Sequence, residues 1–153
     1  MKSICFVCEG NICRSPIAEF LMKQLLKDAW LEDEFKVFSR GLTDYTHGED
    51  THPLSKEQLK LHNIPFETHH AQKISLEEYE KADLVIVMDN YNIQLLKEQF
   101  SLTGRKIKAK KLLSFCGSDR DIMDPYYTRN FDIAFNDIEK GCKALLKVLL
   151  KNQ

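Results

Sequence analysis

The sequence lacks the features that mark several large classes of protein. No apolar stretch approaches the length that a membrane-spanning helix needs. The short apolar run after Met1–Lys2 soon meets charge at Glu9 and Arg14, so we expect no secretory signal peptide. The 22 basic and 23 acidic residues leave a net charge of −1. We therefore expect no membrane insertion and no nucleic-acid partner, although this balance is compatible with a local basic patch.

Cysteine and histidine are also too sparse for a disulfide framework or a recognisable metal site. The cysteines are odd in number and lack the density of a small secreted domain, which favours a reducing, cytoplasmic location. No HExxH or paired CxxC pattern is present, and neither a Walker A nor a GxGxxG sequence occurs. We expect no metal and no cofactor. The five cysteines are Cys5, Cys8, Cys13, Cys116 and Cys142.

The chain alternates between short apolar runs and helix-like segments. Its 153 residues suit one domain over 1–153, with no repeat, low-complexity tract or linker-like run. The alternation predicts a parallel sheet with helices on both faces, which would bind ligands beyond the carboxyl ends of its strands. The predicted strands are Ser3–Val7, Phe35–Phe38, Leu84–Met88 and a segment near Lys111–Leu113. The predicted helices are Ile17–Trp30, Leu54–His62, Tyr91–Phe100 and a final helix with apolar residues from Phe131 to Leu149.

Reactive side chains gather between the first strand and the first helix, in the stretch VCEGNICRSP. Cys8 is followed by five residues and then by Arg14 and Ser15. A loop that opens a helix can aim its N–H groups inward, and the helix dipole favours an anion there. The arginine adds a planar fork for two phosphate oxygens. The same positive field favours the nucleophilic thiolate of Cys8.

Two further residues suit a tight loop of this kind. Gly10 allows close approach of the backbone, and Asn11 tolerates a left-handed conformation. A cysteine after an apolar strand can also be a plain core residue, and an isolated C-x5-R pattern arises by chance. The complete string on a strand–loop–helix is far more specific.

CEGNICRSP closely resembles the phosphate-binding loop of the low-molecular-weight protein tyrosine phosphatases. The resemblance extends over essentially the whole chain and includes Glu19, Met88–Asp89 and the segment Asp124–Tyr127 (DPYY). It implies a four-stranded, mostly parallel sheet flanked by helices, in agreement with the pattern above. It also implies hydrolysis of phosphotyrosine in proteins or peptides, with inorganic phosphate and other oxyanions as competing ligands.

The resemblance assigns roles to the residues of the loop. Cys8 would attack phosphorus and become a phosphocysteine, while Arg14 and the loop amides would bind the equatorial oxygens. The hydroxyl of Ser15 would stabilise the thiolate, and Asn11 would hold the loop in shape. The implied phosphate-binding residues are Glu9, Gly10, Asn11, Ile12, Cys13, Arg14 and Ser15.

The DPYY segment has a chemical logic of its own. A phenolate leaving group has a pKa of about 10, so a positioned acid helps by about 10²–10⁴-fold. Asp124 would supply that proton and then activate the water that cleaves the intermediate. Tyr126 offers an aromatic wall for a substrate ring, with Tyr127 beside it. The family resemblance implies that Tyr45 forms the opposite wall of the pocket. Alone, the segment is more typical of a surface turn, and it is the combination with the cysteine loop that favours a catalytic role.

The family resemblance also gives Cys13 a second role, as a redox partner that forms a reversible disulfide with the nucleophile. A small buried residue would explain the same position. His69 and Glu19 are candidates for the polar network around Asn11, whereas Phe38 stands where some members carry an acidic residue.

One residue departs from the family pattern. Glu9 follows the nucleophile, where an apolar residue usually lines the pocket mouth. Its carboxylate would repel a phosphate dianion, face solvent, or pair with a basic group on a particular substrate. The departure keeps two alternatives open, a protein arginine phosphatase and a phosphate-binding module with little turnover. Ile12 argues against the first, because protein arginine phosphatases typically have threonine at this position. An arsenate reductase of the same fold would need two further cysteines between Cys13 and Cys116, which are absent.

Overall fold

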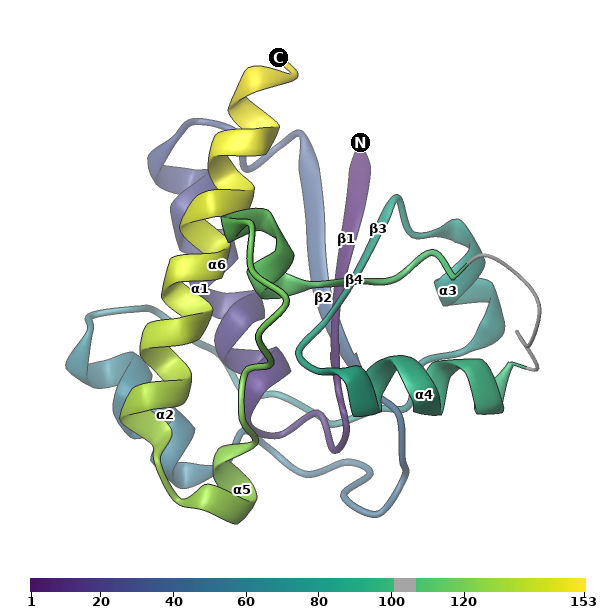
Figure 1. Ribbon diagram of the computed structural model, residues 1–153. Coiled ribbons are helices and arrows are strands. Elements are labelled where there is room, and N and C mark those ends of the chain that lie inside the picture. Colours follow the sequence, from purple (N-terminus) through teal and green to yellow (C-terminus); the bar gives the residue numbers. More distant parts are fainter. Residues whose placement is uncertain (101–106) are drawn as a thin grey trace.

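A four-stranded parallel sheet forms the centre of the computed structural model, which describes residues 1–100 and 107–153 (Figure 1). The strand order is β2-β1-β3-β4, and every pairing is parallel, as the sequence predicted. Strands β1 and β3 are central and covered on both faces, which explains their almost wholly apolar sequences. The strands are β1 (Lys2–Cys8), β2 (Phe35–Gly41), β3 (Leu84–Val87) and β4 (Lys110–Lys111).

Helices cover both faces of this sheet (Figure 1). Ile4 and Phe6 of β1 pack in the larger core cluster with α1 and α6, whereas Cys5 and Val7 pack in a smaller cluster with α3 and α4. This alternation is the period-two pattern of a strand buried on both sides. The helices are α1 (Arg14–Asp28), α2 (Pro53–Leu61), α3 (Leu76–Lys81), α4 (Asn90–Gln99), the 3₁₀ helix η1 (Leu112–Cys116), α5 (Pro125–Thr128) and α6 (Phe131–Lys151).

The structure corrects two of the predicted elements and adds a helix that the sequence did not predict. Helix α1 begins at Arg14 rather than Ile17, so the arginine lies in its first turn. The last strand contains only Lys110–Lys111, because the backbone turns into η1 at Leu112. Helix α3 was not predicted. It has six residues, and its signal is the capping box in which Ser75 and Glu78 satisfy each other's backbone N–H groups.

The carboxyl ends of three strands meet at one edge of the sheet. Cys8 at the end of β1 pairs in register with Gly41 at the end of β2, and β3 ends at Val87 just before Met88–Asp89. The loops that follow these strands therefore lie close together, where ligands bind in parallel sheets.

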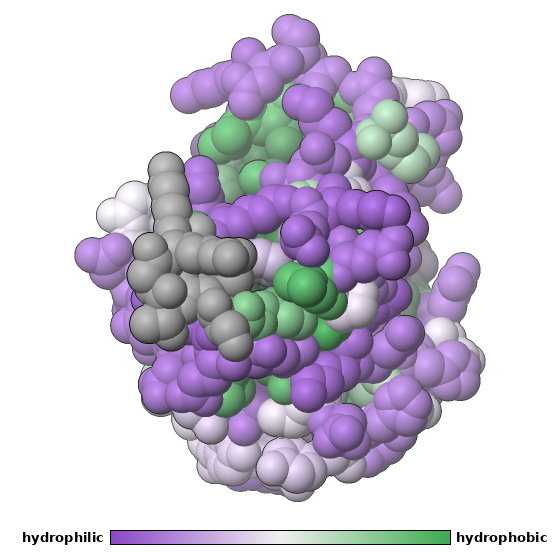
Figure 2. All heavy atoms as spheres, turned by 90° about the vertical axis from the view of Figure 1, so that its right-hand side faces the viewer, coloured by the Kyte–Doolittle hydropathy of each residue, from purple (hydrophilic) through white to green (hydrophobic). Residues whose placement is uncertain are grey.

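The face formed by α3 and α4 is mostly hydrophilic, with apolar residues in limited areas (Figure 2). Within residues 1–100 and 107–153, no helix has both the length and the apolar character needed to cross a membrane.

Candidate active site

The segment from Cys8 to Ser15 forms a tight loop around a small hollow at the carboxyl end of β1. Asn11 adopts a left-handed conformation with φ of 59°, as expected from the sequence. Its buried side chain donates from Nδ2 to Ser15 Oγ at 2.8 Å and to Ser39 Oγ at 3.1 Å. Its Oδ1 accepts from the backbone N–H of Gln72 at 3.0 Å. One amide group thus links the loop to the start of α1, to β2 and to the segment before α3.

The carbonyl groups of this loop are turned away from the hollow. Four consecutive carbonyls accept hydrogen bonds from outside the loop, while the N–H groups of residues 10–13 have no partner among the described residues. Unpaired N–H groups that converge on one point form an anion-binding nest. The donors to the carbonyls of Glu9, Gly10, Asn11 and Ile12 are Leu42 N (2.9 Å), Thr46 Oγ1 (2.7 Å), His69 Nε2 (2.8 Å) and His52 N (2.8 Å).

A buried polar network supports the loop from β2. Ser39 Oγ donates to Glu19 Oε1 at 2.6 Å while it accepts from Asn11. Glu19 joins the polar network around Asn11 through Ser39, and His69 joins it through its hydrogen bond to the carbonyl of Asn11, so both candidates belong to the network. Ser39 was missed, although a serine on the buried face of β2, beside Phe35 and Val37, was an available signal. Phe38 points to the other face.

Cys8 lies at the bottom of the hollow and is only 3% exposed. Its Sγ is 2.9 Å from Ser15 Oγ and accepts from Ser15 N at 3.4 Å. The hydroxyl of Ser15 already accepts from Asn11, so its own hydrogen is available to the sulfur. Ser15 Oγ, Ser15 N and the start of α1 at Arg14 thus surround the sulfur of Cys8 with hydrogen-bonding groups.

Arg14 is almost fully buried, and the two edges of its guanidinium group have different surroundings. Nη1 donates to Asp89 Oδ2 at 2.6 Å and to the carbonyl of Ile122 at 2.7 Å. Nη2 lies 3.4 Å from Asp124 Oδ2, and Nε has no partner within the described residues. Burial opposes the charge, but Cys8, Asp124 and Asp89 raise the pKa of Arg14. Nη1 is anchored by Asp89 and Ile122, whereas Nε and Nη2 lie on the edge that can donate to two oxygens of one anion, in place of the 3.4 Å contact with Asp124.

Asp89 was noted in the sequence without a role, and the structure shows two contacts for it. Besides pairing with Arg14, its Oδ1 accepts from Asn92 N at 2.7 Å and caps α4. An aspartate directly after a central strand was the available signal.

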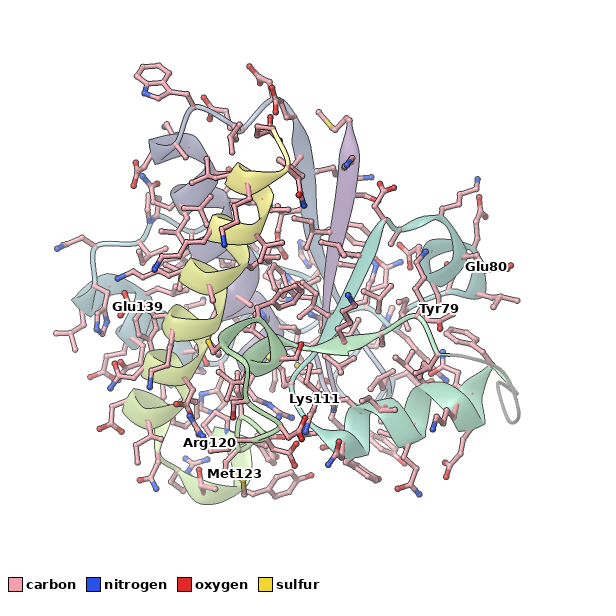
Figure 3. All side chains as sticks on the ribbon, turned by 45° about the horizontal axis from the view of Figure 1, so that its top comes forward. Tyr79, Glu80, Lys111, Arg120, Met123 and Glu139 are labelled. Atoms are coloured by element: carbon pink, nitrogen blue, oxygen red, sulfur yellow. The ribbon has the colours of Figure 1, made fainter. Side chains whose placement is uncertain are left out.

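Asp124 approaches the hollow from the opposite side, on the segment that leads into α5. Its Oδ1 accepts from Tyr126 N at 3.0 Å. The segment is held at several points, of which Figure 3 labels Lys111 and Arg120. Lys111 Nζ pairs with Asp121 at 3.0 Å, and Arg120 binds Asp137 of α6 through two contacts of 2.9 Å. Asp124 is therefore carried by a fixed segment.

The hollow above Cys8 has a volume of ≈ 160 Å³. It brings together the predicted pocket residues, and Thr43 and Thr46 join them as lining residues that sequence reasoning missed. Tyr45 and Tyr126 give it an aromatic rim. Its lining residues are Cys8, Glu9, Gly10, Ile12, Cys13, Thr43, Tyr45, Thr46, Asp124, Tyr126 and Tyr127.

Glu9 and Cys13 both line this hollow, and the pKa of each side chain is raised above its usual value. Tyr127 donates its hydroxyl to Glu9 Oε2 at 3.4 Å, and burial together with Asp124 raises the pKa of Glu9. Burial raises the pKa of Cys13 to about 12, and both Cys8 and Cys13 are free thiols. Over the described part of the chain, no cluster of three or more potential ligands is placed to hold a metal ion.

Comparisons with known proteins agree with this geometry. The family model described as low molecular weight phosphotyrosine protein phosphatase matches residues 3–153. The low molecular weight protein-tyrosine-phosphatase PtpA of Staphylococcus aureus (strain bovine RF122 / ET3-1) is 37% identical over 99% of this chain and 96% of its own length.

Solved structures give the same result. YfkJ from Bacillus subtilis superposes with a TM-score of 0.91 at 36% identity, covering 100% of this chain and 97% of its own. The Drosophila arginine phosphatase superposes with a TM-score of 0.86 at 32% identity, covering 97% and 98% of the two chains. From the matched residues and the shared fold, the chain belongs to the low molecular weight phosphotyrosine protein phosphatase family.

Proposed function

We propose that this protein hydrolyses phosphotyrosine in proteins or peptides through a phosphocysteine intermediate. The observation that carries the proposal is the loop itself, in which the carbonyls bind outside groups while the N–H groups of residues 10–13 have no partner among the described residues. Such a site binds a tetrahedral dianion and presents a nucleophile to it. We propose residues 1–153 as one phosphatase domain, acting in the cytoplasm because a catalytic thiolate needs a reducing compartment.

In the first step, Cys8 Sγ attacks phosphorus in line with the leaving phenolate. The S–P bond forms as the P–O bond to the tyrosine breaks, and protonated Asp124 gives its proton to the departing oxygen. The N–H groups and the free edge of Arg14 bind the three equatorial oxygens, where transition-state charge is spread.

In the second step, water attacks the phosphocysteine from the side that the phenol has left. Asp124 accepts a proton from this water, the P–S bond breaks and inorganic phosphate forms. The hydroxyl of Ser15, 2.9 Å from the sulfur, stabilises the thiolate as it leaves. Inorganic phosphate and other oxyanions then compete for the same donors.

The shape of the hollow favours an aryl ester. Cys8 lies below an aromatic rim formed by Tyr45 and Tyr126. A phosphotyrosine ring can extend between these walls, whereas the short side chain of phosphoserine would hold its phosphorus too far from the sulfur.

A protein arginine phosphatase is the second candidate, and Glu9 is the observation that favours it. Its carboxylate lines the hollow, where it could face a cationic guanidinium leaving group. The Drosophila neighbour is described as an arginine phosphatase. Ile12 in the loop and the aromatic rim favour the aryl ester. A phosphate-binding module with little turnover is the third candidate function.

Cys13 is proposed as a protective redox partner of Cys8. Both sulfurs border the same hollow. A peroxide would oxidise Cys8 to the sulfenic acid and would itself be reduced to water or an alcohol. The thiol of Cys13 would then condense with the sulfenic acid, releasing water and forming a disulfide that a cellular thiol can reduce.

Phosphate release from a phosphotyrosine peptide at mildly acidic pH tests the main proposal. Wild type should turn over, and Cys8→Ser should not, because the serine hydroxyl is a poor nucleophile at that pH. Absence of turnover by folded, reduced wild type would contradict the proposal. A phosphoarginine peptide assayed in parallel separates the second candidate, and binding without hydrolysis of either peptide would support the third.

A further inference from the structure

The side chain of Glu9 lies at the boundary between two neighbouring hollows. The first is the hollow above Cys8, and the second has a volume of ≈ 380 Å³. Glu9, Asp124 and Tyr127 line both. A group that leaves the first hollow toward the second must therefore pass the carboxylate of Glu9.

Contacts at the backbone and at the side chain position the carboxylate of Glu9. The carbonyl of Glu9 accepts from Leu42 N at 2.9 Å and Thr43 N at 3.1 Å, which ties its backbone to the loop after β2. At the other end, the hydroxyl of Tyr127 donates to Oε2 at 3.4 Å. This long, solvent-exposed contact orients the side chain of Glu9 toward α5, at the boundary between the two hollows.

The second hollow is lined by acidic groups. Its one basic lining residue among those described is Arg14, whose Nη1 is already engaged by Asp89. Asp89 and Asp124 lie within ion-pair distance of Arg14, and Asp121 pairs with Lys111. Among the described residues, Glu9 is therefore the acidic lining residue without an ion-pair partner, and a cationic side chain placed there would be attracted to it. The acidic lining residues are Glu9, Asp89, Asp121 and Asp124.

We propose that Glu9 is a specificity-determining residue that selects phosphotyrosine next to a lysine or arginine. The inference rests on the proposed function, because it places the phosphotyrosine ring in the first hollow. An extended peptide advances about 3.3–3.6 Å per residue, so the residue beside the phosphotyrosine lies at the mouth. A long basic side chain from that residue reaches past Glu9 into the second hollow.

A basic substrate side chain beside Glu9 would explain why a carboxylate lies at the mouth of an anion-binding site. Alone, a carboxylate at the mouth weakens the binding of every phosphate dianion. A cation on the substrate offsets that repulsion, whereas an acidic neighbour adds to it. The expected result is discrimination between substrates rather than a general gain in affinity.

Matched peptides measure the effect. Three phosphotyrosine peptides that differ only in carrying Lys, Gln or Glu beside the phosphotyrosine are compared by kcat/KM. A partly exposed charge pair changes binding by up to about fivefold, so exchanging attraction for repulsion should give wild type a preference for Lys over Glu of about tenfold. The preference should fall as salt is added.

Variants assign the preference to Glu9. Glu9→Gln keeps the length of the side chain and an acceptor for Tyr127, and should reduce the preference to about twofold, which is left to the more distant carboxylates. Asp44→Asn is the matched control, because Asp44 is exposed, follows β2 and lines neither hollow. This control should keep the wild-type preference. Equal kcat/KM for the three peptides, or an unchanged preference in Glu9→Gln, would overturn the inference.

A binding measurement separates this inference from the proposed function. The dissociation constants of the same peptides for Cys8→Ser, measured by calorimetry, should show the same order without any turnover. If wild type hydrolyses no peptide, the proposed function fails and the order of dissociation constants still decides the role of Glu9. Hydrolysis of a phosphoarginine peptide alone, with no order among the dissociation constants, would overturn both.

Discussion

Gly41 at the end of β2 sets the shape of the phosphate-binding loop by leaving room for it. A Cβ atom on Gly41 would lie 3.0 Å from Asn11 Cβ, 3.1 Å from the carbonyl oxygen of Glu9 and 3.3 Å from the carbonyl carbon of Gly10. All three atoms belong to the loop, and none is the end of a flexible side chain. At Gly10 itself a Cβ would crowd only the side chain of Thr46, at 3.2 Å.

The size of the effect of Gly41→Ala follows from these contacts. Ordinary contact begins at 3.4 Å, so the loop must move by about 0.4 Å from its closest contact of 3.0 Å. A displacement of about 1 Å costs about 100-fold in rate, so a proportional barrier change gives about a sixfold loss in kcat/KM. Overpacking lowers the free energy of unfolding by about 1–3 kcal/mol. Alanine also reduces the conformational entropy of the unfolded chain, which raises the free energy of unfolding by about 0.4–1 kcal/mol. The net change in Tm should be a fall of about 2–4 °C.

The assay is kcat/KM for a small aryl phosphate together with the thermal midpoint. Gly141→Ala is the matched control, because its Cβ would lie 2.4 Å from Leu112 Cγ, in the packing between α6 and η1. This variant should lose at least as much Tm but change kcat/KM by less than about twofold at a temperature where it is folded. Wild-type kcat/KM in Gly41→Ala, or equal losses of activity in both variants, would refute the reasoning.

Three further predictions concern the surroundings of the loop. Ser39→Ala leaves Glu19 without its buried donor and should cost about 1–3 kcal/mol in urea unfolding; a wild-type midpoint would contradict this. Asp124→Asn should lower kcat by about 10²–10⁴-fold on phosphotyrosine, and far less on a nitrophenyl phosphate, whose leaving group needs no proton. Although burial opposes it, the hydrogen bond from Lys56 helps lower the pKa of Asp50 from 3.8 to about 2. The depressed folded-state pKa stabilises the protein above pH 3.8 and the benefit is lost as pH falls toward about 2. Asp50→Asn should therefore be less stable than wild type at neutral pH and equal to it at the lowest pH, and a constant difference would be contrary to this.

The elements that the sequence predicted best are those whose own pattern decides their structure. The apolar runs of β1 and β3 and the periodic apolar residues of α6 needed no distant partner to be recognised. The loop from Cys8 to Ser15 was predicted because its residue types and spacing carry the chemistry directly. The short helix α3 was missed because six residues are too few for periodicity to appear.

The supports of the site could not be predicted in the same way, because they depend on how distant segments pack. Ser39 is only a serine in a strand until Asn11 and Glu19 are brought to it. The separate uses of the two edges of Arg14 require the positions of Asp89 and Asp124. The carboxylate of Glu9 was noticed in the sequence, but its contact with Tyr127 follows only from the fold.

The supports of the loop also connect catalysis with folding. Asn11 binds Ser39 and His69, which lie 28 and 58 residues further along the chain, and Arg14 binds Asp89, which is 75 residues away. A chain that has formed only β1 and α1 contains Cys8 and Arg14, but it lacks the contacts to the loop carbonyls that shape the nest. The complete site therefore forms only when β2, the segment before α3 and the segment after β3 have docked beside β1 and α1.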